Sequence, residues 1–410
     1  MKDRRSSPFK GKSLFAGLTK NIFTLGIVSF LTDVSSEMIY PLLPIFLTTV
    51  LGSSIAFVGL IEGIAESTAS LLKFFSGWLS DRLKKRKILT LWGYSLSSLT
   101  RPLIAISTSS WQVLLIRFTD RAGKGIRTAP RDALIADSVS MECRGKAFGF
   151  HRSLDHLGAV IGPLIASLFL VQGASFRLVF FLAFIPSLLS VLVLAIFVEE
   201  KKGDYNPLPS STDSHSHALS RKFPYFLVII AIFSLGNSSD AFLILRAKEC
   251  GISLALIPIL WVFLHVIKTL SSFPGGIFSD RFGRGKVIIL GWLIYALVYF
   301  EMGRVSTPQA IWLLFGIYGL YFGLTEGVEK ALVADLVKGE TRGTAYGIYN
   351  AVIGIAALPA SLVMGWLWQT FGAHVAFSFG GGLALLAAIL LFILMRGKGR
   401  GNPTPTIYIE

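Results

Sequence analysis

Two carboxylic acids, Asp33 and Glu37, lie one helical turn apart in the first apolar stretch of the chain. An ionised side chain in an apolar or membrane environment is costly, so acids in such a place are default candidates for a functional role. Burial and nearby cations act in opposite directions on a carboxyl group, which lets it bind and release a proton as its surroundings change. We therefore predict that Asp33 or Glu37 carries protons.

A stretch with eight charged residues follows between residues 110 and 137. At about 100° per residue, seven of them, all except Asp137, fall within an arc of roughly 140° on one face of a helix. Such a face has to meet protein or water, because lipid would penalise every member. With two acids from later stretches, five of these residues make up a predicted cavity: Arg117, Asp120, Arg121, Lys124, Arg127, Asp240 and Glu326. The alternative is that these charges are structural ion pairs.

The composition indicates which elements position these charges. Of the 410 residues, 53% are hydrophobic and only 15% are charged, whereas a soluble protein carries about a quarter charged residues. The net charge of +15 could suggest nucleic acid as a partner. However, the basic residues cluster in short loops between apolar runs, as in proteins that place such loops in the cytoplasm. We predict a protein of the plasma (inner) membrane, embedded in the lipid bilayer, with both termini cytoplasmic and no nucleic-acid partner.

Apolar runs long enough to cross a bilayer recur along the chain. The predicted spans are 20–48, 55–80, 88–108, 110–137, 146–172, 176–198, 223–247, 253–279, 287–304, 308–336, 343–370 and 373–395. The fourth span is too polar for a simple hydropathy test. It is required by parity, because the basic segments 82–87 and 199–222 should lie on the same side.

The second half of the chain repeats the first. Asp137 corresponds to Asp335 at an offset of 198 residues, and the SSE of residues 35–37 is echoed by the SSD of residues 238–240. Self-similarity of this kind indicates two parallel six-helix repeats with a substrate site between them. The predicted domains are an N-terminal bundle, 1–198, a cytoplasmic linker, 199–222, and a C-terminal bundle, 223–410. The fold class is an all-α membrane protein with 12 transmembrane helices.

The loops at the repeated aspartates carry the first family resemblance. The segments 77–82 (GWLSDR) and 276–281 (GIFSDR) resemble the loop signature of the major facilitator superfamily, and the second continues with Gly283 and Arg284. The resemblance implies two six-helix bundles, with helices 1, 4, 7 and 10 lining a central cavity. It also implies a latch that holds each loop against its bundle. The predicted latch residues are Asp81, Lys85 and Asp137 in the first half, and Asp280, Arg284 and Asp335 in the second.

A glycine pattern in the fifth span points to a direction of transport. Gly149, Gly158, Gly162 and Pro163 resemble a motif of the exporting antiporters of the superfamily, although alanine and serine stand at its end where glycines are usual. Small residues also serve ordinary helix packing in membranes, which is the alternative interpretation. The prolines at 41 and 44, which follow Asp33, resemble the first helix of drug-exporting members and favour the same direction.

The repeat also predicts a gate. At the 198-residue offset, Arg131 corresponds to Glu329 and Asp132 corresponds to Lys330, so the charges are reversed between the halves. Corresponding positions lie at equal depth, and opposite charges there can meet when the halves close. We predict that one or both of these pairs close the cytoplasmic gate, since a contact made in one state only shifts the equilibrium between states. Alternatively, each charge pairs within its own half.

These features predict a secondary transporter that exports a small organic molecule in exchange for protons. The alternative is an uptake symporter or facilitator for an organic anion; a metal-ion exporter and a membrane-embedded enzyme are less favoured. No ATP-binding sequence, metal-ligand spacing or nucleophile–base pair stands out, so we predict no cofactor, no bound metal and no enzymatic activity. The expected partners are a small-molecule substrate and protons, and we expect a monomer. The sign of the substrate's charge stays open.

Overall fold

The computed structural model describes residues 18–83, 85–139, 144–200, 222–337 and 342–396, and every regular element in these segments is a helix. The α-helices are α1 (Lys20–Ile39), α2 (Leu43–Thr49), α3 (Ile55–Leu83), α4 (Arg86–Ile106), α5 (Ser110–Asp137), α6 (Arg144–Val171), α7 (Phe176–Leu182), α8 (Phe184–Phe197), α9 (Lys222–Gly236), α10 (Ala241–Glu249), α11 (Ile257–Phe282), α12 (Arg284–Met302), α13 (Pro308–Asp335), α14 (Arg342–Phe371) and α15 (Ala373–Arg396). A short 3₁₀ helix, Leu254–Leu256, precedes α11.

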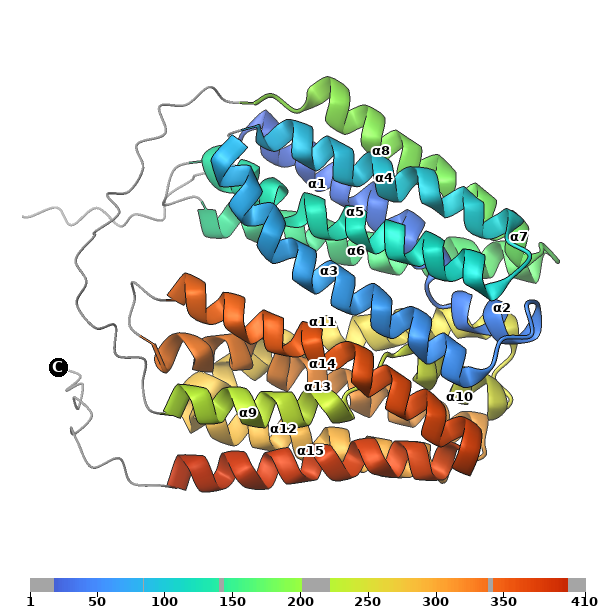
Figure 1. The fold of residues 1–410 in the computed structure, drawn as a ribbon, viewed down its shortest axis with the longest axis vertical. Coiled ribbons are helices and arrows are strands. Elements are labelled where there is room, and N and C mark those ends of the chain that lie inside the picture. The colour runs from blue at the N-terminus through green and yellow to red at the C-terminus, as the bar shows by residue number, and fades with distance from the viewer. Residues whose placement is uncertain (1–17, 84, 140–143, 201–221, 338–341, 397–410) are drawn as a thin grey trace, which may run out of the picture.

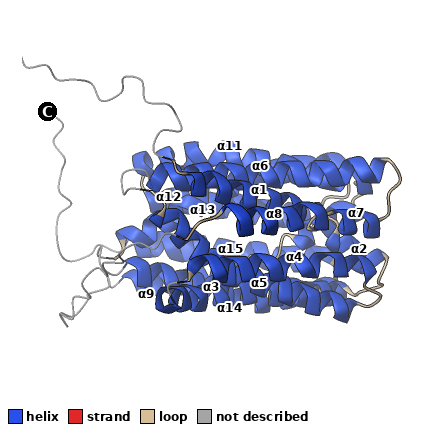
Figure 2. Ribbon diagram, turned by 90° about the horizontal axis from the view of Figure 1, so that it is seen from above, coloured by secondary structure: helices blue, strands red, loops and turns tan. Residues whose placement is uncertain are grey.

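The helices run roughly parallel in two layers, one made of α1 to α8 and the other of α9 to α15 (Figures 1 and 2). Within the described residues, ten helical segments are long and apolar enough to cross a membrane. The two predicted spans missing from these ten are those at α4 and α5. Both form long helices that pack closely on each other, so the predicted all-α membrane fold is confirmed, polar fourth span included.

Three predicted spans are broken rather than continuous. The first is split into α1 and α2 around Tyr40–Leu42, and the sixth into α7 and α8 at Ala183. A proline follows each break closely (Pro44 and Pro186), and proline removes a backbone donor and clashes with the preceding helical turn. The seventh span is split into α9 and α10, with residues 237–240 outside both helices. Hydropathy averaged over a span does not reveal such breaks, because each span stays apolar overall, even where residues 237–240 (NSSD) are polar.

The two layers meet most extensively along α3 and α14. Here the backbones come so close that a methyl group added to Gly59 would lie 2.3 Å from the carbonyl oxygen of Ser361. One added to Gly365 would lie 2.8 Å from the Cα atom of Ala56. We call the end where α8 stops and α9 starts the linker end, and the end that holds α2 and α10 the opposite end. The layers are packed together at the opposite end and diverge toward the linker end (Figure 1).

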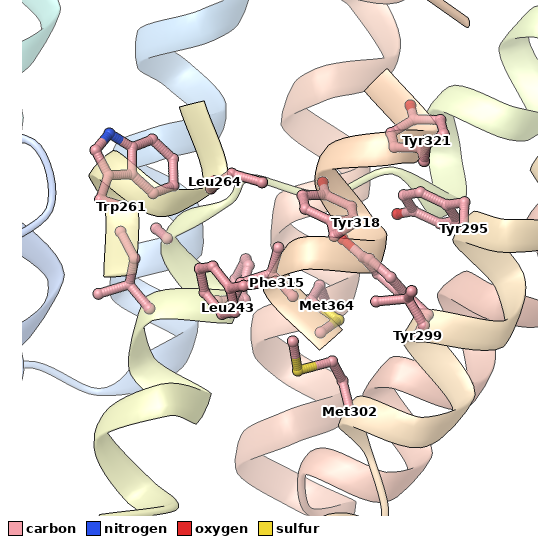
Figure 3. Packing of buried hydrophobic residues seen from close by; sticks show 14 of the residues in the cluster. Leu243, Trp261, Leu264, Tyr295, Tyr299, Met302, Phe315, Tyr318, Tyr321 and Met364 are labelled. Atoms are coloured by element: carbon pink, nitrogen blue, oxygen red, sulfur yellow. The ribbon is translucent and has the colours of Figure 1, made fainter. Parts of the chain in front are cut away.

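The second layer contains a buried aromatic core. Tyr295, Tyr299, Tyr318 and Tyr321 lie on α12 and α13 with ring centroids 4.1–6.4 Å apart. Figure 3 shows these four rings beside Phe315 and the methionines. The hydroxyl of Tyr295 donates to the carbonyl of Gly236, the last residue of α9. Since α9 ends there, that carbonyl has no partner within its own helix, and the tyrosine satisfies it.

Candidate functional site

A cavity of about 440 Å³ lies between the two layers. Its lining comes from α1, α3, α4 and α5 on one side, and from α11, α13, α14 and the α9–α10 break on the other. Ten charged residues line it: Asp33, Glu37, Glu66, Arg101, Asp120, Arg121, Lys124, Arg127, Asp240 and Lys268. This lining includes five of the seven residues predicted for the cavity. The other two, Arg117 and Glu326, do not line it and form ion pairs with Glu62 and Lys268.

The two acids of α1 are seated against the glycines of α6. A methyl group added to Gly158 would lie 2.9 Å from the Cβ atom of Asp33, and one added to Gly162 would lie 3.1 Å from that of Glu37. The glycine pattern therefore brings α6 directly against the turn of α1 that carries both carboxyl groups. Gly149 and Pro163 lie on the same helix. A larger side chain at Gly158 or Gly162 would displace one of these acids.

Glu37 also joins the two halves. Its carboxylate accepts a hydrogen bond of 2.9 Å from the ring nitrogen of Trp261, which lies on α11 and is buried. The ring of Tyr40 packs against the same tryptophan, with centroids 5.2 Å apart. A charged acceptor makes this bond stronger than one between neutral groups. Asp33, by contrast, makes no side-chain hydrogen bond or ion pair with any described residue.

Most charges on α5 are paired within the first half. Nη2 of Arg117 lies 2.8 and 2.9 Å from the two carboxylate oxygens of Glu62, and both side chains are buried. Arg121 lies 3.6 Å from Glu66 and 3.5 Å from Asp120. Asp120 also has Arg101 of α4 at 3.8 Å. These contacts agree with the alternative of structural ion pairs for this part of the charged face.

Two cations of α5 have no carboxylate partner among the described residues. Arg127 donates to the hydroxyl of Ser97 at 2.7 Å and lies over the ring of Tyr94, 4.4 Å from its centroid. The side chain of Lys124 has neither an ion pair nor a hydrogen bond in this part of the chain, and it lines the cavity. Lys124 is thus the cation of this face that is open to a ligand.

The second half contributes Asp240, which lies in the break between α9 and α10. Its carboxylate accepts a hydrogen bond of 2.7 Å from the hydroxyl of Tyr318, a member of the tyrosine core shown in Figure 3. Glu326 pairs with Lys268 at 3.5 Å, and Lys268 lies 3.8 Å from the ring centroid of Phe322. The second half therefore presents one hydrogen-bonded acid and one paired cation to the cavity.

The predicted gate residues are not joined across the halves in this arrangement. Arg131 pairs with its neighbour Asp132 at 2.8 Å. Glu329 accepts hydrogen bonds from Trp292 at 3.0 Å and from Tyr349 at 2.6 Å, and Lys330 is exposed. Because the layers diverge at this end (Figure 1), a contact that forms on closure would be open here. The gate stays a prediction.

Each half has an ion pair at the place predicted for a latch. In the second half Arg284 lies 3.0 Å from Asp335. In the first half Arg86 pairs with Asp137, while the expected partner Lys85 is exposed. Arg86 corresponds to Arg284 at the repeat offset of 198 residues, so the alignment of the halves, rather than the loop resemblance, identifies the right cation. The side chains of Asp81 and Asp280 lie outside the described residues.

Arg101 and Trp261 are among the lining residues that the sequence did not predict. Arg101 is a buried cation in the apolar third span, and its charge within that span was the available signal. Trp261 had no signal, because a tryptophan in an apolar helix is ordinary and its partner Glu37 lies 224 residues away.

Comparison with known proteins bears on this arrangement. The family model described as Major Facilitator Superfamily matches residues 25–267 and 226–408, which together cover almost the whole chain. The chain belongs to this family. As a member it is an integral membrane transporter, not an enzyme.

The relatives include an MFS-type transporter of Methanocaldococcus jannaschii, which is 36% identical over 92% of this chain and 95% of that protein. Multidrug resistance protein MdtG of Enterobacter lignolyticus is 24% identical over 93% of both chains. Among solved structures, the nucleoside transporter NupG has a TM-score of 0.78 at 13% identity, covering 92% of this chain and all of that one. A bacterial homologue of the lysosomal transporter Spinster, solved in an inward-facing and occupied conformation, has a TM-score of 0.76 at 15% identity, with coverage of 97% and 100%. These structures support the fold of this superfamily transporter.

Proposed function

We propose that this transporter is a proton-coupled antiporter that exports a small organic molecule by alternating access. In this proposal Asp33 and Glu37 bind the protons, and the cavity between the layers binds the substrate. The linker end faces the cytoplasm of a plasma (inner) membrane, because the basic loops lie there. The protein works as a monomer.

The positions and contacts of Asp33 and Glu37 are the main support for this proposal. Asp33 is a cavity acid that has no polar partner among the described residues, and Gly158 fixes its position. Glu37 joins the two halves through Trp261. A proton on either acid therefore changes either the charge of the cavity or a contact between the halves, and both couple proton binding to transport. The similarity to MdtG supports the outward direction.

Transport by purified protein in lipid vesicles tests the proposal. Vesicles with an imposed pH gradient are assayed against a panel of cationic, anionic and neutral organic compounds. We expect at least one compound to accumulate against its own gradient, and Asp33→Asn or Glu37→Gln to abolish this accumulation while the protein still folds. Full proton-driven transport in both variants would place the carrier elsewhere, and transport that ignores the pH gradient would contradict antiport.

One observation favours a second candidate function, uptake of an organic anion. Lys124 lines the cavity and has no carboxylate partner in the described segments, so it is free to bind an anionic group. The same panel separates the two proposals. Accumulation of an anion together with protons, rather than in exchange for them, and its loss in Lys124→Gln would favour the symporter.

A further inference from the structure

A buried pair of titratable residues on α6, His151 and Asp155, has no role in the cavity. Nδ1 of His151 lies 3.4 Å from a carboxylate oxygen of Asp155, one turn further along the helix. The two residues are only 2% and 8% exposed. Nε2 of His151 and the second oxygen of Asp155 have no hydrogen-bond partner in the described part of the chain. Buried polar atoms are nearly always satisfied, so two such atoms in one pair call for an explanation.

The pair lies between Asp33 and the linker end. Asp155 is one turn from Gly158, the glycine seated against Asp33, and its charge acts on Asp33. His151 is a further turn toward the start of α6, which lies at the linker end. At about 1.5 Å per residue, the seven residues from His151 to Gly158 span about 10 Å. The α6 pair thus reaches from the depth of Asp33 toward the linker end.

Other charged groups face the pair from two helices. The charges of Arg131 and Asp132 on α5 act on His151, and the side chain of Asp132 is 43% exposed. Asp155 also has Arg152 of its own helix at 3.7 Å, but that arginine is 67% exposed, so its charge is largely screened by water. The titratable residues Asp155 and His151 are therefore followed, toward the linker end, by Asp132, an acid that is partly exposed to water.

We propose that Asp155 and His151 form a proton path between Asp33 and the linker end, separate from the cavity. The inference rests on the proposed role of Asp33. The O–H bond of protonated Asp33 breaks as one forms on the Asp155 carboxylate, directly or through water. Asp155 then protonates Nδ1 of His151, and the imidazolium releases its other proton from Nε2 to water near Asp132. The ring then keeps its one proton on Nδ1, and a rotation about the Cβ–Cγ bond turns this N–H toward the water and the unprotonated Nε2 toward Asp155, ready to accept the next proton.

The charges around the cavity explain why a separate path is useful. Lys124 and Arg127 act on Asp33 from the cavity side, and with the other cations of α5 they repel a proton that approaches through the cavity. A substrate in the cavity would obstruct that route as well. A path through α6 lets Asp33 exchange its proton with the linker side while the cavity is occupied.

Infrared spectroscopy after a rapid drop in pH tests the path without a substrate. The purified full-length protein in lipid nanodiscs gives a carboxylic acid C=O band for Asp33, identified by its loss in Asp33→Asn. We expect His151→Ala and Asp155→Asn to slow the rise of this band by about tenfold or more, the low range for loss of a positioned proton-transfer group. Imidazole in the buffer should restore the rate of His151→Ala toward that of the wild type measured in the same buffer.

His156→Ala is the matched control, because His156 lies on the same helix but is exposed. Its rate should stay within about twofold of the wild type, well below the tenfold expected for the path residues. If the His151 and Asp155 variants protonate Asp33 at the wild-type rate, the proton reaches Asp33 through the cavity and the path is wrong. If no band depends on Asp33, that acid is not the carrier and the path is wrong, while the proposed function then rests on Glu37 and is decided by transport in Glu37→Gln. His151→Gln replaces His151→Ala if the smaller side chain prevents folding.

Discussion

Removal of Arg117 should destabilise the protein more than removal of any exposed arginine. The side chains of Arg117 and Glu62 are 5% and 2% exposed, and Nη2 of the arginine lies 2.8 and 2.9 Å from the carboxylate oxygens. In Arg117→Met the glutamate is left buried without its partner. Breaking a buried pair in this way costs about 3–5 kcal/mol, which is about a hundredfold to a few thousandfold in the unfolding equilibrium.

The double variant Glu62→Met, Arg117→Met removes both charges. It shows whether the instability of Arg117→Met comes from the unpaired buried glutamate. Replacing both members by apolar side chains of similar volume is often neutral. Arg117 also lies 3.8 Å from Asp120, but Asp120 keeps Arg101 and Arg121. We therefore expect the double variant to recover at least half of the stability lost in Arg117→Met.

The assay is unfolding of the purified protein by sodium dodecyl sulfate in mixed micelles, followed by tryptophan fluorescence. Arg304→Met is the matched control, because Arg304 lies 3.0 Å from Glu301 but the two side chains are 57% and 40% exposed. An exposed pair of this kind contributes about 0–1 kcal/mol. The reasoning is refuted if Arg117→Met is as stable as the control, or if the double variant recovers none of the stability lost in Arg117→Met.

Three further predictions concern movement of the halves. Arg131→Glu should impair transport, and adding Glu329→Arg should restore it at least in part; a double variant no better than the single, with no cross-link between cysteines at the two positions, would exclude the gate. Gly59→Val should open the opposite end, since even one methyl group would lie 2.3 Å from a carbonyl oxygen of α14, and labelling of a cysteine on α2 by an impermeant maleimide should rise several-fold. Arg86→Ala and Arg284→Ala should each slow transport by a similar factor, measured as initial rates in vesicles, because the two arginines occupy corresponding positions in the repeat; equal rates in wild type and both variants would rule out a latch.

The sequence was sufficient for most of the architecture, because membrane spans and repeats are encoded locally. The fourth span, which is α5, is too polar to be found by hydropathy. It was predicted because the two basic segments around it should lie on the same side of the membrane. The breaks at residues 40–42 and 237–240 were not predicted, since hydropathy averaged over a whole span does not report where a helix is interrupted. The identity of ion-pair partners was also out of reach. Arg117 pairs with Glu62 of α3, and Glu37 accepts a hydrogen bond from Trp261 of α11. Both contacts depend on how helices far apart in the chain are packed.

The repeat shows which features of the halves differ and which are alike. The ion pairs Arg86–Asp137 and Arg284–Asp335 occupy corresponding positions, so the ends of the two bundles are braced in the same way. The cavity walls are not alike. The first half lines the cavity with a network of paired charges on α4 and α5, whereas the second half contributes Asp240, held against a tyrosine core, and one cation, Lys268. The ion pairs that both halves share are suited to a movement that both halves make. The charges that differ between the two cavity walls are suited to orienting a substrate between them. The asymmetric pair of Lys124 on one wall and Asp240 on the other is therefore where substitutions should change which compounds are transported.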